Sequence, residues 1–219
     1  RKSAMQDAIK RIQSGAPCLL VGTQMLAKGH HFPDVTLVAI LDADGGLFSS
    51  DFRGPERMAQ MITQVAGRAG RAEKPGQVLI QTHMAEHRLL VDLTEHGYAT
   101  IAHSELDGRE KAGLPPCSFI ALLRAEANNA AIANEFLESA CELAEQLCVE
   151  MGLDRVDMLG PVASPMERRA GRYRAQLLIQ APQRSALHQL LHPWLIQLEG
   201  HSLGRKVRWS IDVDPLDMF

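Results

Sequence analysis

The sequence lacks several features that would place it in a familiar class of protein at once. No apolar run approaches the roughly 20 residues of a membrane span, and no secretory signal opens the chain. Nor does it contain the Gly-rich loop ending in Lys-Ser or Lys-Thr that cradles the phosphates of a nucleotide. The first residue is Arg1 rather than methionine, so we expect a fragment of a longer protein.

Charge and cysteine usage narrow the classes further. A formal net charge of -3 argues against a protein that binds polyanions over its whole surface, although it leaves room for local basic patches. The four cysteines form no C-x-x-C pair, which argues against zinc ribbons and redox motifs. Cys141 and Cys148 are seven residues apart on one apolar helix face, so we expect buried free thiols, which suit a reducing cytoplasm.

The first half of the chain alternates between strand and helix patterns. Short continuous apolar runs predict buried strands, and 3.6-residue periodicity predicts helices between them. Buried strands joined through helices indicate a parallel sheet, as in the back half of an α/β domain. The expected strands are residues 18–22, 36–44 and 76–82, and the expected helices are residues 2–13, about 55–65 and stretches within 86–111.

The adjacent prolines Pro115 and Pro116 forbid a helix, so we place a domain boundary there, between residues 1–113 and 114–219. Beyond it the pattern predicts strand, helix, strand, strand, helix and strand, the order of a split βαβ, ferredoxin-like α+β domain. The strands are expected at residues 118–127, 156–162, 173–181 and 206–214, with amphipathic helices over about 128–151 and 187–198.

The stretch QVAGRAGR, residues 64–71, carries two arginines with little side chain between them. Gln64, Arg68 and Arg71 stand at i, i+4 and i+7, so on a helix they project to one side. Guanidinium groups match phosphate oxygens in geometry and remain charged at any working pH. A polyphosphate presented by another protein surface fits this pattern. A capped helix with two solvated arginines is the alternative, but it does not explain the intervening glycines.

A polar loop, residues 22–35, connects two of the expected strands, and such loops bind ligands in α/β folds. Thr23 and Gln24 offer groups suited to a nucleic-acid backbone, and Lys28 adds a positive charge beside flexible Gly29.

Two patterns resemble metal sites only superficially. His30 and His31 are adjacent and have no further ligands at suitable spacing. Asp42 and Asp44 stand at a strand end, where we expect structural or lobe-facing carboxylates rather than Mg²⁺ ligands. We therefore predict no metal site in this chain.

A basic turn, residues 167–174, is the notable feature of the second half. It places Arg168, Arg169 and Arg172 around a glycine, with Tyr173 among them. Charge with an aromatic ring suits branched or single-stranded DNA, through phosphate contacts and stacking of about 1–3 kcal/mol per base. A solvated hairpin turn explains the same residues.

Two motifs connect these observations to a family. QVAGRAGR resembles motif VI of the superfamily 2 helicases, and GTQMLAKGHHFP resembles their motif V. The chain as a whole is similar to the primosomal replication-restart helicases, most specifically over residues 17–84. The resemblance implies the later part of a RecA-like helicase lobe 2 followed by a C-terminal domain. It also implies that a longer protein would hold the phosphate loop, the acidic box and a zinc-binding insertion.

The resemblance also implies residue roles. Arg71 corresponds to the arginine finger that reaches the γ-phosphate of ATP, with Arg68 as its companion and Gln64 as a sensor of nucleotide state. Such a finger contributes on the order of 10³ to 10⁵ in rate in related enzymes. Motif V would supply Gly29 to the nucleotide side and DNA-backbone contacts from Thr23, Gln24 and Lys28. His31 replaces the aspartate that many relatives carry there.

The implied function is an ATP-dependent 3′-to-5′ DNA helicase that restarts stalled replication forks in the bacterial cytoplasm, associated with the nucleoid. Its cofactors would be ATP and Mg²⁺, bound mainly by another lobe, and zinc bound outside this chain. Its partners would be forked or single-stranded DNA, single-stranded-DNA-binding protein and other primosome proteins, with no membrane. Two alternatives stay open: a non-enzymatic module that binds DNA or protein, and another superfamily 2 translocase on branched nucleic acid.

Overall fold

The structure is a computed structural model that describes residues 12, 14, 16–22, 35–67, 69 and 76–218. It divides into two compact units, Arg1–Glu105 and Leu106–Phe219. The division falls within a helix, somewhat before the proline pair at which the sequence analysis places its boundary. The helix expected over residues 2–13 lies outside the described residues, apart from Ile12.

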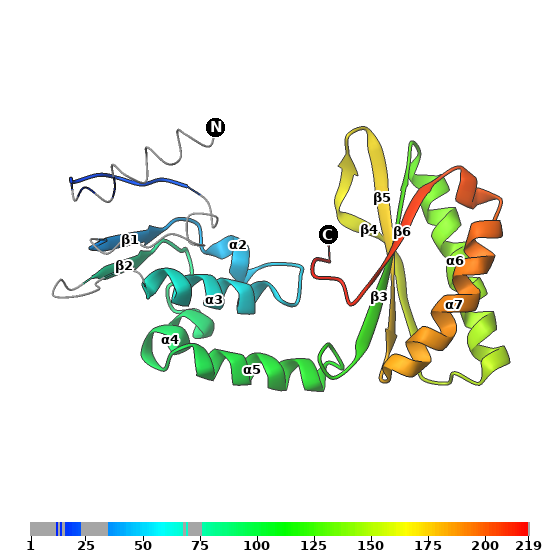
Figure 1. Ribbon diagram of the computed structural model, residues 1–219, viewed down its shortest axis with the longest axis horizontal. Helices are drawn as coiled ribbons and strands as arrows, with labels where there is room; N and C mark the ends of the chain where they lie inside the picture. The colour runs from blue at the N-terminus through cyan, green and yellow to red at the C-terminus, as the bar shows by residue number, and fades with distance from the viewer. Residues whose placement is uncertain are drawn as a thin grey trace. The chain divides into compact units, whose positions relative to one another are not determined.

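A small parallel sheet organises the first unit (Figure 1). Strand β1 (Leu37–Ile40) pairs with β2 (Gln77–Ile80), with Leu37 opposite Gln77. Val38, Ile40, Val78 and Ile80 face the apolar core, whereas Leu37 and Leu79 are more than half exposed. Both strands are thus confirmed, but they are shorter than predicted and buried on one face only.

The strand expected over residues 18–22 is wrong in this structure. Residues 16–22 adopt neither helix nor strand, and their side chains are exposed, Leu19 by 90% and Val21 by 79%. A strand is stabilised by ladder hydrogen bonds to a neighbour. Among the described residues β1 pairs with β2 alone, so this segment has no neighbour to pair with. An apolar run therefore did not suffice to make a strand here.

Four helices of the first unit lie wholly within the described residues. They are α2 (Asp44–Leu47), α3 (Gly54–Ala66), α4 (Arg88–Glu95) and α5 (Tyr98–Lys111), the last of which crosses the division between the units. In α3 the buried residues Met58, Ala59 and Ile62 recur at helical spacing and pack with Leu89 and Leu90 of α4. The helices expected near 55–65 and within 86–111 are confirmed.

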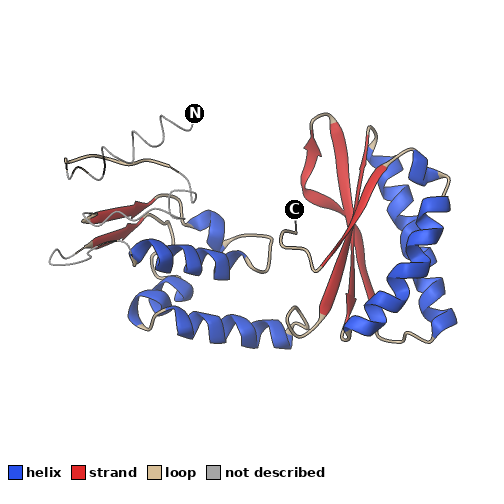
Figure 2. Ribbon diagram, viewed as in Figure 1, coloured by secondary structure: helices blue, strands red, loops and turns tan. Residues whose placement is uncertain are grey.

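The second unit is a four-stranded antiparallel sheet in the order β4-β5-β3-β6 (Figure 2). Its strands are β3 (Phe119–Ala127), β4 (Asp157–Arg169), β5 (Arg172–Ala181) and β6 (Arg208–Val213). With one helix after β3 and one after β5, this is the ferredoxin-like arrangement that the sequence pattern predicts. β4 extends well beyond the expected residues 156–162. The sequence pattern did not predict its later half, because two irregularities in its pairing with β5 interrupt the alternation of buried and exposed residues.

Both long helices lie on the same side of this sheet (Figures 1 and 2). They are α6 (Ala130–Met151) and α7 (Arg184–Gly200), and a short 3₁₀ helix, η2 (Leu203–Arg205), follows. Asn129 caps α6 by accepting a hydrogen bond from the Ala131 amide at 2.9 Å. The buried Trp194 donates its indole N–H to the Ala140 carbonyl at 2.8 Å, which joins α7 to α6.

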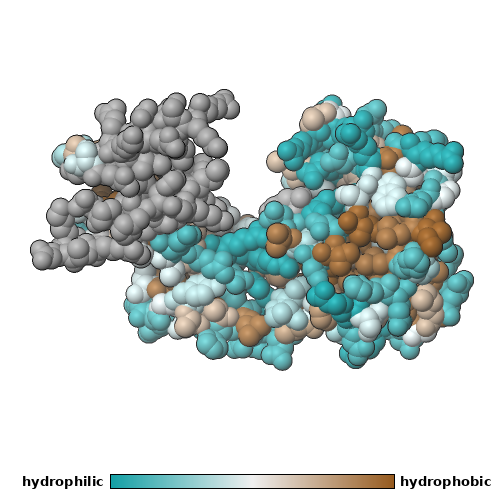
Figure 3. Space-filling view, viewed as in Figure 1, coloured by the Kyte–Doolittle hydropathy of each residue, from teal (hydrophilic) through white to brown (hydrophobic). Residues whose placement is uncertain are grey.

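In the view of Figure 3 the visible surface of the second unit is mostly hydrophilic. In the view of Figure 3 its largest apolar area lies over the meeting of sheet and helices, with hydrophilic residues around it. None of the helices in the described part of the chain combines the length and apolar character needed to cross a membrane.

The cysteines are all free. Cys148 is buried as predicted, but Cys141 is only half-buried, so the expectation of two buried thiols holds for one. Burial, with the nearby charge of Glu145, raises the pKa of the Cys141 thiol to about 11.

Candidate nucleic-acid interface

Gln64 is the one residue of the QVAGRAGR triad that the structure describes. It lies exposed in the last turn of α3, opposite the buried Met58 and Ile62. The helix ends at Ala66, and the Gly67 amide closes it by donating to the Thr63 carbonyl at 3.0 Å. The first glycine of the motif is therefore a helix terminus. Arg68 and Arg71 lie outside the described residues, so the alignment of the three side chains stays a prediction.

The polar loop of motif V is likewise outside the described residues. This holds for its candidate DNA contacts Thr23, Gln24 and Lys28, and for Gly29 and His31. Their roles remain predictions. The structure describes the chain on both sides, with residues 16–22 before the loop and β1 soon after it.

Asp44 has a structural role at the end of the parallel sheet. It begins α2, and its carboxylate accepts hydrogen bonds from the Thr82 hydroxyl and, at 3.0 Å, from the His83 amide. These donors favour the ionised form and hold the pKa of Asp44 below its usual value. Among the described residues, no group of three or more His, Cys, Asp or Glu side chains is placed to hold a metal ion.

A buried carboxylate that the sequence analysis did not single out shapes the loop before α3. Asp51 is 1% exposed, accepts from the Arg53 amide at 2.9 Å, and pairs with the Arg57 guanidinium at 3.1 Å. Arg53 in turn lies over the Phe52 ring, with 4.3 Å between the guanidinium carbon and the ring centroid. The sequence indicated this role only through an aspartate in a loop that leads to Pro55 at a helix start.

The basic turn predicted at residues 167–174 is the β-hairpin between β4 and β5. Arg169 and Arg172 face each other across a two-residue loop of Ala170 and Gly171, both with positive φ (49° and 80°). Two positive φ values in succession are typical of the tight turn that matches the strand twist. For Ala170 this conformation costs roughly 1–2 kcal/mol. The turn therefore has an unfavourable backbone conformation at Ala170 and brings the positive charges of Arg169 and Arg172 close together.

The hairpin distributes its four candidate residues over two faces of the sheet. Arg168 and Tyr173 are direct cross-strand partners, and the Arg168 guanidinium carbon lies 5.1 Å from the Tyr173 ring centroid. Tyr173 shares its face with Ala175, which belongs to the core beneath the helices. Arg169 and Arg172 project to the opposite face, which we call the open face.

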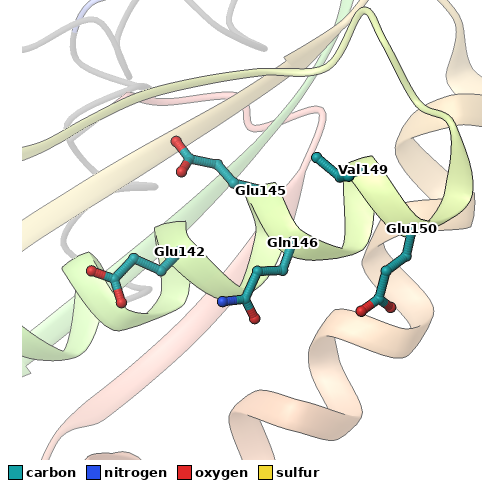
Figure 4. Close-up of a pocket in the computed structure, with 5 residues that line it drawn as sticks. All are labelled: Glu142, Glu145, Gln146, Val149 and Glu150. Carbon is teal, nitrogen blue, oxygen red and sulfur yellow. The ribbon is translucent and has the colours of Figure 1, made fainter.

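The helical side of the same unit carries the opposite charge. The outer surface of α6 has a shallow depression lined by Glu142, Glu145, Gln146, Val149 and Glu150 (Figure 4). The α6 sequence contains five glutamates and no lysine or arginine. A nucleic-acid backbone is repelled by such a surface. Within this unit, charge therefore favours the hairpin and the open face over α6 for contacts to DNA.

In comparisons with known proteins, the two halves of the chain match two different family models. Residues 1–73 match the family model of the helicase conserved C-terminal domain, and residues 110–216 match that of the primosomal protein N C-terminal domain. Three similar curated proteins, each called replication restart protein PriA, come from Haemophilus influenzae (44% identical over 219 residues), Bacillus subtilis (38% over 218) and Synechocystis (37% over 218). The alignments cover 100% of this chain but 29%, 27% and 25% of those proteins.

The fold and the two family matches define a partial RecA-like helicase lobe with a parallel sheet, followed by a ferredoxin-like α+β domain. The similarity to replication restart proteins extends over the whole chain. Residues 110–216 carry the primosomal protein N C-terminal domain, and the chain spans less than a third of the length of the replication restart proteins to which it is similar.

Proposed function

We propose that this chain is the C-terminal part of an ATP-dependent 3′-to-5′ DNA helicase that recognises stalled or branched forks and restarts replication through primosome assembly. The observation that carries the proposal is the 44% identity, over all 219 residues, to a replication restart protein. The charge distribution of the second unit is compatible with DNA binding, since arginines gather at the hairpin and glutamates on α6.

In this proposal the first unit completes an ATP site that is formed mainly by another lobe. Arg71 reaches the γ-phosphate, Arg68 assists it, and Gln64 senses the state of the nucleotide. Gly29 lies on the nucleotide side of motif V. Bound ATP and Mg²⁺ would supply the phosphoryl-transfer chemistry, and the arginines of this chain would stabilise the charge that develops on the phosphate.

The same proposal assigns the DNA contacts and partners. Thr23, Gln24 and Lys28 contact the backbone of the translocated strand, and Arg168, Arg169, Arg172 and Tyr173 contact forked or single-stranded DNA. The further partners are single-stranded-DNA-binding protein and other primosome proteins in the bacterial cytoplasm, near the nucleoid. Zinc would be bound by parts of a longer protein outside this chain.

Arg71→Ala in the longer protein tests the finger role. We expect DNA-stimulated ATP hydrolysis to fall by about 10³-fold or more while DNA affinity changes little, because the guanidinium acts on the transition state. Arg88→Ala is the matched control, since its side chain is 87% exposed on α4. Equal losses of hydrolysis and DNA binding in Arg71→Ala would reject the finger assignment.

The 219-residue chain alone tests the division of labour. Because its sequence contains no phosphate loop, we expect DNA binding without ATP hydrolysis above background. In that state it is the non-enzymatic binding module that the sequence analysis left open. ATP turnover by the purified chain would contradict the proposed dependence on another lobe.

A further inference from the structure

We propose that the open face of the second unit's sheet binds the DNA backbone through an arginine track that runs from the hairpin across to Arg208 on β6. The track consists of Arg169, Arg172, Arg174 and Arg208. It deepens the proposed function and rests on the DNA binding proposed there. The new element is Arg208, which is distant in sequence from the hairpin and belongs to no helicase motif.

Strand register places these arginines on one surface. Glu126 of β3 is the partner of Arg174 on β5 and of Arg208 on β6, so the three residues form one row across three strands. Side chains alternate along a strand, and the neighbours of Glu126 on β3, Ala125 and Ala127, belong to the core beneath the helices. The row therefore lies on the open face.

Arg172 continues the surface toward the hairpin. It is two residues from Arg174 on the same strand, about 7 Å along the sheet, and it pairs with Arg169 of β4. Arg208 lies two strands from Arg174, about 10 Å away. From β4 to β6 the track thus crosses roughly 14 Å of sheet, a span that suits an extended polyanion with several phosphates.

Most of the track carries positive charge with no internal partner. Glu126 pairs with Arg174 at 3.1 Å, and the Arg174 side chain is 10% exposed. Within the described residues, Arg169, Arg172 and Arg208 take part in no ion pair. Like charges directly opposite each other, such as Arg169 and Arg172, destabilise a strand pair. A bound phosphate would relieve this repulsion.

The other half of the open face is engaged by the chain's own C-terminal segment. Arg124 pairs with Asp212 at 3.1 Å and also donates to the Asp217 carbonyl. The Asp214 amide donates to the Ile120 carbonyl at 2.9 Å. The segment after β6 is thus fixed to this half of β3. The track therefore occupies the half nearer the hairpin.

DNA fits this surface better than an acidic peptide for two reasons. The arginines come from three of the four strands, so one ligand must present anions at several separated points, as a phosphate backbone does. Each guanidinium can also donate hydrogen bonds to two phosphate oxygens. The glutamate-rich α6 lies on the other side of the sheet and would repel DNA. The electrostatic potential of the domain therefore directs DNA to the open face.

Arg208→Ala in the full 219-residue chain is the test, with a fluorescently labelled forked DNA titrated between about 50 and 200 mM salt. We expect weaker binding and a salt slope reduced by about 0.7–0.9, the contribution of one phosphate contact. Arg208→Lys keeps the charge and should retain the slope. Arg205→Ala is the matched control, because it removes the same charge from η2, outside the open face. Glu126→Gln should tighten binding, since it removes the only carboxylate in the row.

The outcomes separate this inference from the proposed function. If Arg169→Ala and Arg172→Ala reduce the slope but Arg208→Ala behaves like Arg205→Ala, DNA contacts only the hairpin and the track is wrong, while the proposed function stands. If no arginine variant changes DNA binding, the track and the hairpin contacts are both wrong, while the DNA contacts proposed for Thr23, Gln24 and Lys28 stand. If polyglutamate binds in an Arg208-dependent way and DNA does not, the face recognises an acidic protein segment and the inference is overturned.

Discussion

The Asp44 carboxylate accepts a hydrogen bond from the Thr82 hydroxyl, and this contact joins the segment that follows β1 to the segment that follows β2. The His83 amide donates to the same carboxylate at 3.0 Å. Since β1 and β2 are parallel, both segments leave the same end of the sheet. An acidic residue at a position typical of ligand binding therefore serves as an internal clamp.

The clamp makes the first unit sensitive to acid. Because the fold lowers the pKa of Asp44, its stabilising contribution is present above the ordinary carboxyl pKa and is lost as the pH falls through the lower folded value. We expect Asp44→Asn to lower the stability at neutral pH and to flatten its loss in acid, as measured by hydrogen exchange of the His83 amide. Asp42→Asn, at an exposed position, is the control. Unchanged protection in Asp44→Asn would show that the clamp contributes nothing.

Replacement of the buried Asp51 in the loop before α3 is expected to lower the free energy of unfolding. Asp51→Ala leaves the Arg53 amide and the Arg57 guanidinium without this acceptor, at a cost of about 1–3 kcal/mol in urea unfolding. Arg88→Ala removes an exposed i,i+4 pair with Asp92 and should cost only about 0.3–0.5 kcal/mol. If the two variants lost similar amounts of unfolding free energy, the buried Asp51 would be no more important for stability than an exposed ion pair.

Trp194 provides a separate test of the helix pair in the second unit. Trp194→Phe keeps most of the apolar contact but loses the hydrogen bond to Ala140, so we expect a loss of about 1 kcal/mol. Trp194→Ala also leaves a cavity and should lose about 3–5 kcal/mol. Ile196→Ala, at a position that is 60% exposed, should stay within about 0.5 kcal/mol of the parent. Circular dichroism during denaturation measures all three.

Cys141 should react slowly with iodoacetamide at pH 8, because its pKa near 11 leaves little thiolate. Its rate should rise steadily as the pH approaches 11. Glu145→Gln removes a neighbouring negative charge and should speed the reaction at pH 8, whereas Glu138→Gln should have less effect. Peptide-resolved mass spectrometry follows the site. Equal rates at Cys141 and the exposed Cys117 would contradict the raised pKa.

The periodicity of apolar residues was sufficient to predict a helix or strand where one face of the element is buried. The spacing of Phe136, Ala140 and Leu147 predicted α6, and the alternation along 173–181 predicted β5. It failed where pairing decides the structure. Residues 18–22 are apolar yet form no strand, and the later half of β4 is held by β5 despite an irregular pattern. Of the candidate site residues, Gln64 and the hairpin residues fall within the described part of the chain, and the functional roles of all the candidates stay predictions.

By itself the sequence determined the order of elements in the α+β domain and the presence of a basic turn, because local spacing and residue chemistry encode both, and it carried the resemblance to the helicase motifs. Only the tertiary structure decided that Asp44 and Asp51 bind within their own unit, and that the hairpin residues divide between two faces. It also brought Arg208 into the row of Arg174 and Glu126. Those relationships depend on strand register, which joins residues far apart in the chain and which no local pattern specifies.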